Sequence, residues 1–114
     1  NIAWLITPKI HLENLTQAYL SFETSNSFAD QSILEVLVSS NWDGTEDHII
    51  KANWQPLPGK IVDNAEDFRK WIHSGDINLS EYLTGIHIAF RYKGTGETES
   101  DGTYELDNIF IYAK

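Results

Sequence analysis

Apolar and polar residues alternate with a period of two along much of this chain, and this pattern constrains the fold more than any other feature. The alternation is clearest over residues 86–92, where one phase is large and apolar and the other is mostly small or polar. Successive side chains of a strand point to opposite faces, so the pattern predicts an antiparallel strand with one buried face. Further strands are expected over residues 4–10, 20–23, 33–39 and 104–112.

The expected strands differ in their surroundings. Residues 33–39 are almost continuously apolar, which is typical of a central strand with both faces covered. Residues 4–10 contain Pro8, which cannot donate a ladder hydrogen bond, so this strand is expected to lie at an edge or to bend there. One-sided strands must bury their apolar faces against a second sheet, which predicts an all-β, antiparallel jelly-roll β-sandwich or a related Greek key. A short helical spacing is present only over residues 63–72.

The alternation in the last strand has two interpretations. Without an irregularity, Glu105 and Asp107 share a face with the isoleucines of residues 104–112, and neither face is wholly apolar. Either the strand is central with a polar end, or a β-bulge near Asp107 and Asn108 shifts the phase by one residue.

Length and charge narrow the classes of protein. The 114 residues suit one domain, and we expect residues 1–114 to form a single β-sandwich domain, part of a longer protein because no initiating Met is present. The net charge of −9 argues against a nucleic-acid partner, which needs a basic surface. No stretch approaches the ~20 apolar residues that span a bilayer, so membrane insertion is not expected. The absence of Cys excludes disulfides and thiol chemistry.

Several segments, in order along the chain, resemble the choice-of-anchor J and cleaved-adhesin families of bacterial surface proteins, which are distantly similar to MAM domains. They are AYLSFE at 18–23, LEVLVSS at 34–40, NWDG at 41–44, Trp54, GDINLS at 75–80, IAFRY at 88–92 and YELDNI at 104–109. The resemblance covers nearly the whole chain and implies a jelly-roll sandwich that serves as a non-catalytic module of a secreted or cell-surface protein. The family's usual N-terminal strand has no counterpart here.

No recognisable catalytic motif is present. The chain lacks a Gly-x-Ser-x-Gly elbow, a Walker loop and a dinucleotide fingerprint. The four histidines do not form a His-x-x-x-His pair and are expected at the surface or on edge strands. We therefore predict that the protein is not an enzyme.

The four tryptophans indicate sugar binding as an alternative to core packing, because an indole face can stack on the apolar face of a pyranose. Trp4 and Trp71 belong to apolar patterns and are expected in the core. Trp42 lies beside Asp43 in a predicted turn, and Trp54 lies between two amide residues. Trp42, Asp43 and Trp54 are the candidate ligand-binding residues, although packing of Trp42 beneath its own loop explains the pattern equally well.

Glu23 and Asp107 are the candidate metal ligands. The related sandwich families imply a structural Ca²⁺ held by these two carboxylates and by backbone carbonyls. A carboxylate near a core costs several kcal/mol unless it is paired or hydrogen-bonded, so Asp107 needs a partner. The alternative is that Asp107 accepts backbone N–H groups or faces water.

Three functions follow, in decreasing order of support. The first is a non-catalytic module for adhesion or carbohydrate attachment, with a glycan or another cell-surface molecule as its ligand. The second is a structural spacer that supports a neighbouring catalytic domain. The third is a stand-alone hydrolase, which needs an opposed pair of acids. Exposure of Trp42 or Trp54 beside hydrogen-bonding side chains favours the first, and burial of both indoles favours the second.

Overall fold

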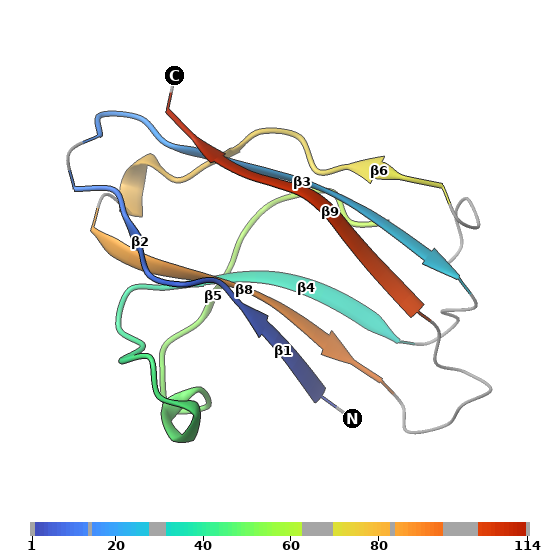
Figure 1. The fold of residues 1–114 in the computed structure, drawn as a ribbon, viewed down its shortest axis with the longest axis horizontal. Coiled ribbons are helices and arrows are strands. Elements are labelled where there is room, and N and C mark those ends of the chain that lie inside the picture. The colour runs from blue at the N-terminus through green and yellow to red at the C-terminus, as the bar shows by residue number, and fades with distance from the viewer. Residues whose placement is uncertain are drawn as a thin grey trace.

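The fold is an all-β sandwich of two antiparallel sheets (Figure 1). The computed structural model describes residues 2–13, 15–27, 32–62, 70–82, 84–94 and 103–113. Its elements are β1 (Ile2–Ile6), β2 (Ile10–His11), β3 (Tyr19–Ser27), β4 (Ile33–Ser39), the 3-10 helix η1 (Glu46–His48), β5 (Gln55–Pro56), β6 (Ile72–His73), β7 (Ile77–Asn78), the 3-10 helix η2 (Ser80–Tyr82), β8 (Gly85–Lys93) and β9 (Thr103–Tyr112).

One sheet has five strands and the other has four. The five-stranded sheet has the order β1-β8-β4-β5, and β2 also pairs with β8. In the four-stranded sheet, β3 pairs with β6 and β7 and also with β9. The longest described strands, β3, β8 and β9, lie where the alternation predicted strands, and β4 matches the predicted span. The predicted strand over residues 4–10 is interrupted around Pro8, between β1 and β2, because proline cannot donate a ladder hydrogen bond.

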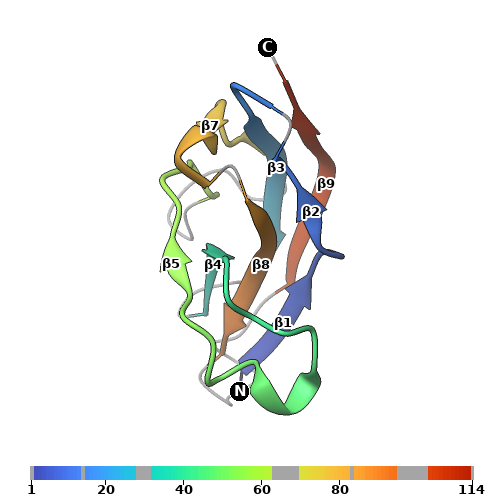
Figure 2. The same cartoon turned by 90° about the vertical axis from the view of Figure 1, so that its left-hand side faces the viewer.

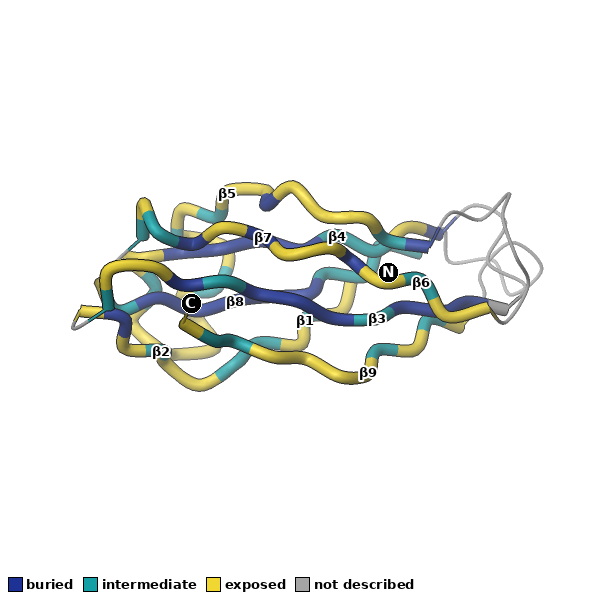
Figure 3. Tube along the Cα trace, turned by 90° about the horizontal axis from the view of Figure 1, so that it is seen from above, coloured by how far each residue is buried: buried dark blue, intermediate teal, exposed yellow. Residues whose placement is uncertain are grey.

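The core lies between the two sheets and is built mainly from the inward phases of β3, β4 and β8. Figure 3 shows the long buried stretches of β3 and β8. Phe22 of β3 meets Phe90 of β8 edge to face, with the ring centroids 5.0 Å apart. Such edge-to-face pairs add to the stability gained by burying the apolar area. The buried cluster comprises Leu12, Ala18, Leu20, Phe22, Val36, Val38, Leu57, Ile77, Leu79, Ile86, Ile88 and Phe90.

A bulge in β9 decides between the two interpretations of the last strand. Between Ser21 and Glu23 the register on β9 moves from Phe110 to Asp107, so β9 carries one residue more than β3 over this step. Asn108 has a φ of 51°, the left-handed conformation that such bulges use. The bulge lets both Leu106 and Ile111 pack against the core although they are an odd number of residues apart.

Three expectations about aromatic and helical residues need correction. Trp71 is 42% exposed and does not belong to the core, and Trp4 is only half-buried and lies on the outer face of its sheet. The short helix expected over residues 63–72 falls mostly outside the described residues, but Ile72 is part of strand β6. His87 is buried on the central strand β8, whereas the histidines were expected at the surface or at edges.

Candidate functional site

A row of three side chains crosses the outer face of the five-stranded sheet. Arg91 of β8 is the register partner of Trp4 on β1 and of Glu35 on β4. Directly opposite residues of antiparallel strands project to the same face, so the ladder places the indole, the guanidinium and the carboxylate side by side. The guanidinium carbon lies 5.2 Å from the centroid of the Trp4 ring, which is within cation–π range.

Arg91 and Glu35 form a bidentate ion pair. Arg91 Nε donates to one Glu35 oxygen over 2.9 Å, and Nη2 donates to the other over 3.0 Å. Lys93 Nζ lies 3.5 Å from the same carboxylate. The hydrogen bonds from Arg91 lower the pKa of Glu35, assisted by the charges of Arg91 and Lys93 and opposed by partial burial. The pair therefore holds the guanidinium plane over Trp4 in one orientation.

The loop between β4 and β5 folds back over this outer face and is held by its own polar groups. The Asn41 side-chain oxygen accepts the backbone N–H of Asn53 over 2.8 Å, which joins the two ends of the loop. The Asp43 carboxylate accepts the backbone N–H and the hydroxyl of Thr45 and a hydrogen bond from His48. These hydrogen bonds hold the pKa of Asp43 well below its usual range, and the one from the Thr45 hydroxyl has the largest effect. The Asp43 side chain thus stabilises the turn that precedes η1.

Three indoles form a contiguous cluster where the loop meets the sheet. The Trp54 ring lies 5.4 Å from Trp4 and 6.1 Å from Trp42, centroid to centroid. Trp42 in turn meets the buried His87 ring edge to face at 4.6 Å. The indole N–H groups of Trp42 and Trp54 donate to the carbonyls of Thr45 and Ile49, both over 2.8 Å. The rings are therefore fixed by packing and by hydrogen bonds within the loop.

An open groove of about 540 Å³ lies beside this cluster, within the size range of small-ligand sites. We call it the aromatic groove. One wall comes from the sheet and the other from the loop, and Ile50 at the rim is 89% exposed. It is lined by Ile2, Trp4, Ile50, Ala52, Asn53, Trp54 and Arg91.

The structure brings the predicted ligand-binding residues into one loop but gives them different surroundings. Trp54 lines the aromatic groove. Trp42 packs behind Trp54, against His87. Asp43 is occupied by the hydrogen bonds of its own turn. Both indoles are half-buried, so they lie between the exposure that favours a binding module and the burial that favours a spacer.

The predicted metal ligands lie on the other sheet. Glu23 and Asp107 are register partners, so both carboxylates project from the outer face of the four-stranded sheet. Asp107 is exposed and accepts the backbone N–H of Asn108, and the Asn108 side-chain amide donates to Glu23. Among the described residues, no group of three or more His, Cys, Asp or Glu side chains is arranged to hold a metal ion. Calcium binding by Glu23 and Asp107 remains a prediction.

Two groups that build the aromatic groove were not predicted from the sequence. In the sequence, Arg91 is only a polar residue of an alternating strand, and the apolar pattern around Trp4 predicts a core position for it. Trp4 shares its phase with Ile2 and Ile6 in a strand that is apolar on both faces, so periodicity could not say which face is buried. The pairing of Trp4 with Arg91 depends on the register of β1 against β8, which only the fold supplies.

A scan against protein-family models and a search of curated proteins gave no significant match. Within the residues that the structure describes, no helix has the length and apolar character needed to cross a membrane.

Proposed function

We propose that the chain is a non-catalytic β-sandwich module of a secreted or cell-surface protein and that it binds carbohydrate in the aromatic groove. The observation that carries the proposal is the Trp4–Trp54 pair beside the Asn53 amide and the Arg91 guanidinium. Indole faces pack against the apolar face of a pyranose, and amide and guanidinium groups hydrogen-bond to sugar hydroxyls. The rings are already held in place, so a ligand would lose little free energy in ordering them.

A non-catalytic role agrees with the chemistry of the groove. None of its lining residues is an acid, and the carboxylate paired with the lining residue Arg91, that of Glu35, is occupied by Arg91 and Lys93. Glycoside hydrolysis usually requires two carboxyl groups flanking the bond that is cleaved. Jelly-roll connectivity and membership of an adhesin-like group of surface modules, which the sequence segments resemble, are part of the same proposal.

A structural spacer is the second candidate, and one observation favours it. Trp42 and Trp54 both donate their indole N–H groups to carbonyls of their own loop, as purely structural tryptophans do. In that case the tryptophan cluster only fastens the loop to the sheet.

A glycan-array screen of the folded protein tests the proposal. We expect binding to at least one class of pyranose, and we expect Trp4→Ala and Asn53→Ala to abolish it. Trp71→Ala is the matched control, because Trp71 is 42% exposed and immediately precedes β6 of the other sheet. Asn53→Ala removes an exposed amide but keeps the backbone N–H that binds Asn41, so it is expected to fold. No binding by the wild-type protein would favour the spacer.

A further inference from the structure

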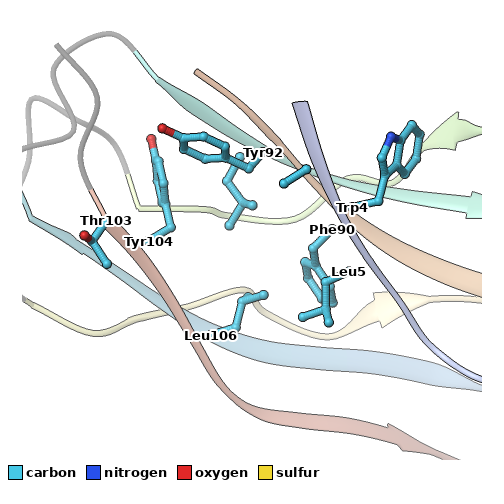
Figure 4. Close-up of a pocket in the computed structure, with 9 residues that line it drawn as sticks. Trp4, Leu5, Phe90, Tyr92, Thr103, Tyr104 and Leu106 are labelled. Carbon is cyan, nitrogen blue, oxygen red and sulfur yellow. The ribbon is translucent and has the colours of Figure 1, made fainter. Parts of the chain in front are cut away.

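The aromatic groove lies on the outer side of β1. Trp4 and Leu5 extend to opposite sides of this strand, and Leu5 lines an inner pocket of about 410 Å³ together with Leu106 of the other sheet (Figure 4). Figure 2 shows the β4–β5 loop running alongside β1. Ile50 of this loop and Ile2 of β1 line the aromatic groove from its two walls. The groove is therefore built from the outer face of the sheet and from the loop, rather than from the space between the sheets.

Exposed aliphatic side chains accompany the indoles in the aromatic groove. Ile2 on the sheet wall is 63% exposed, Ile50 on the loop wall is 89% exposed, and Ala52 also lines the groove. Covering apolar side chains of this kind with an apolar group is favourable because it removes their surface from water. The hydroxyl groups at the rim of a plain hexose give these residues no apolar partner. The aliphatic side chains therefore favour a sugar that carries an apolar substituent.

The polar side chains of the groove offer mainly hydrogen-bond donors. Arg91 uses Nε and Nη2 for Glu35, and the Asn53 side-chain oxygen accepts a hydrogen bond from Gln55 Nε2 over 2.9 Å. Among the hydrogen bonds of the described residues, none involves Arg91 Nη1, Asn53 Nδ2 or the indole N–H of Trp4. All three of these groups are donors. The groove therefore favours a ligand whose substituent is a hydrogen-bond acceptor.

The charges around the groove favour a neutral acceptor over an anionic one. The chain has a net charge of −9, and Glu46 and Asp47 lie in η1 of the loop that forms one wall. The positive charge of Arg91 is already balanced by its ion pair with Glu35. A sugar carboxylate or sulfate would be repelled by this acidic surface, whereas an amide carbonyl is a neutral acceptor.

We propose that the carbohydrate bound in the aromatic groove is an N-acetylated amino sugar. Its acetamido carbonyl accepts hydrogen bonds from Asn53 Nδ2 and Arg91 Nη1, and its methyl group packs against Ile50 and Ile2. One small substituent thus meets both the donors and the aliphatic side chains of the groove. The inference rests on the carbohydrate binding proposed above and adds the group that is recognised.

Matched sugars that differ only at C2 test the substituent. The first set is tri-N-acetylchitotriose with two controls: cellotriose, which has hydroxyls at C2, and the glucosamine trimer, which has ammonium groups there. The second set is N-acetylgalactosamine with galactose. In calorimetric titrations at physiological salt, we expect the acetylated sugar of at least one set to bind at least tenfold more tightly than its controls. In saturation-transfer NMR, its acetyl methyl protons should receive the strongest saturation.

The outcomes distinguish this inference from the proposed function. If the unacetylated sugars bind as tightly as the acetylated ones in both sets, the N-acetyl inference is overturned and carbohydrate binding stands. Tightest binding of the glucosamine trimer would overturn the inference as well, because attraction of a cation to the acidic protein would then explain binding. If no acetylated sugar binds, the inference fails, and the glycan-array screen decides on carbohydrate binding.

An Asn53→Asp substitution tests the donor. It keeps an oxygen for Gln55 and the backbone N–H that Asn41 accepts, but it replaces the amide N–H groups by an acceptor. We expect the affinity for the acetylated sugar to fall at least tenfold. An unchanged affinity would overturn the role of Asn53 as the donor to the acetamido carbonyl.

An Ile50→Ser substitution tests the contact with the methyl group. Ile50 is 89% exposed, so the variant is expected to fold and to lose at least threefold of the preference for the acetylated sugar over its unacetylated control. Ile33→Ser is the matched control, because Ile33 is 46% exposed and does not line the groove. An equal loss of affinity for the acetylated and unacetylated sugars in Ile50→Ser would contradict packing of the methyl group at this site.

Discussion

The outer faces of the two sheets place charged residues opposite one another in similar geometry but with different consequences. On the five-stranded sheet, Glu35 and Arg91 are partners of opposite charge and form a bidentate pair. On the four-stranded sheet, Glu23 and Asp107 are partners of like charge. Directly opposite charges of opposite sign stabilise a sheet, and like charges destabilise it.

The difference shows on which outer face the charge of a residue is balanced by its register partner. The Arg91–Glu35 pair leaves the guanidinium over Trp4 and helps to shape the aromatic groove. Among the described contacts of the Glu23–Asp107 pair, the repulsion between the two carboxylates is offset by the side-chain amide of Asn108 at the bulge, which donates a hydrogen bond to Glu23. We therefore expect the first face to lose stability when a charge is removed and the second to gain it.

Removal of Arg91 should have the largest effect on this comparison. Arg91→Ala removes two charge-assisted hydrogen bonds and the contact with Trp4, and it leaves Glu35 with only Lys93. We expect a loss of about 1–3 kcal/mol in the free energy of unfolding, measured by urea denaturation. Lys51→Ala provides a control in which an exposed cation of the β4–β5 loop is removed. An equal loss in both variants would mean that the pair is not specifically stabilising.

The pH dependence of stability tests the same pair through its carboxylate. Because Arg91 lowers the pKa of Glu35 in the folded state, ionised Glu35 stabilises the fold above its ordinary pKa of 4.5. That stability is lost as the pH falls below 4.5 through the lowered value. The stability difference between the wild type and Glu35→Gln should therefore shrink between about pH 5 and pH 3.

An Arg91→Ala background is the control for this titration. Without the guanidinium, the same Glu35→Gln substitution should give a stability difference that changes less over the same pH range. If the difference is just as dependent on pH in both backgrounds, Arg91 is not the cause of the lowered pKa.

Neutralising Asp107 should have a smaller effect of the opposite sign. Asp107→Asn removes a like charge opposite Glu23 and keeps the shape of the side chain. In the presence of a chelator, we expect the variant to be more stable by about 0.2–1 kcal/mol, measured by urea denaturation. A loss of stability would show that the Asp107 carboxylate serves the fold, for example through its bond to the Asn108 N–H.

If the predicted calcium site exists, the Asp107 carboxylate stabilises the protein when Ca²⁺ is present instead of destabilising it. Adding Ca²⁺ to chelator-treated wild-type protein should then raise the melting temperature, and Asp107→Ala should abolish the increase. The wild type in Mg²⁺ is the control for general ionic effects. Absence of a calcium-specific shift would remove the metal prediction.

The alternation of apolar and polar residues predicted the positions of the strands, but it did not predict which face of each strand is buried. Alternation located β3, β4 and β8 because each places apolar residues on a face that the second sheet covers. It also narrowed β9 to two arrangements, and the left-handed Asn108 selects the bulge. Trp4 and Trp71 were misassigned because an apolar residue in phase with others can face a loop or solvent as well as a core.

The candidate site was only partly predictable for a different reason. Trp42 and Trp54 stood out because aromatic residues are unusual in polar loops, but the groove forms only where Trp54 meets Trp4 and Arg91. These residues are far apart in the chain and are joined by the β1–β8 register and by the fold of the β4–β5 loop. Neither is encoded in a local pattern.

The most direct test of carbohydrate binding in the aromatic groove is a two-dimensional ¹H–¹⁵N NMR titration that follows the four indole N–H signals. The titrant is the pyranose oligosaccharide that binds best in the glycan screen. We predict that the signals of Trp4 and Trp54 shift in a saturable way, while that of the exposed Trp71 stays in place. Saturable shifts that leave Trp4 and Trp54 unaffected would contradict binding in this groove.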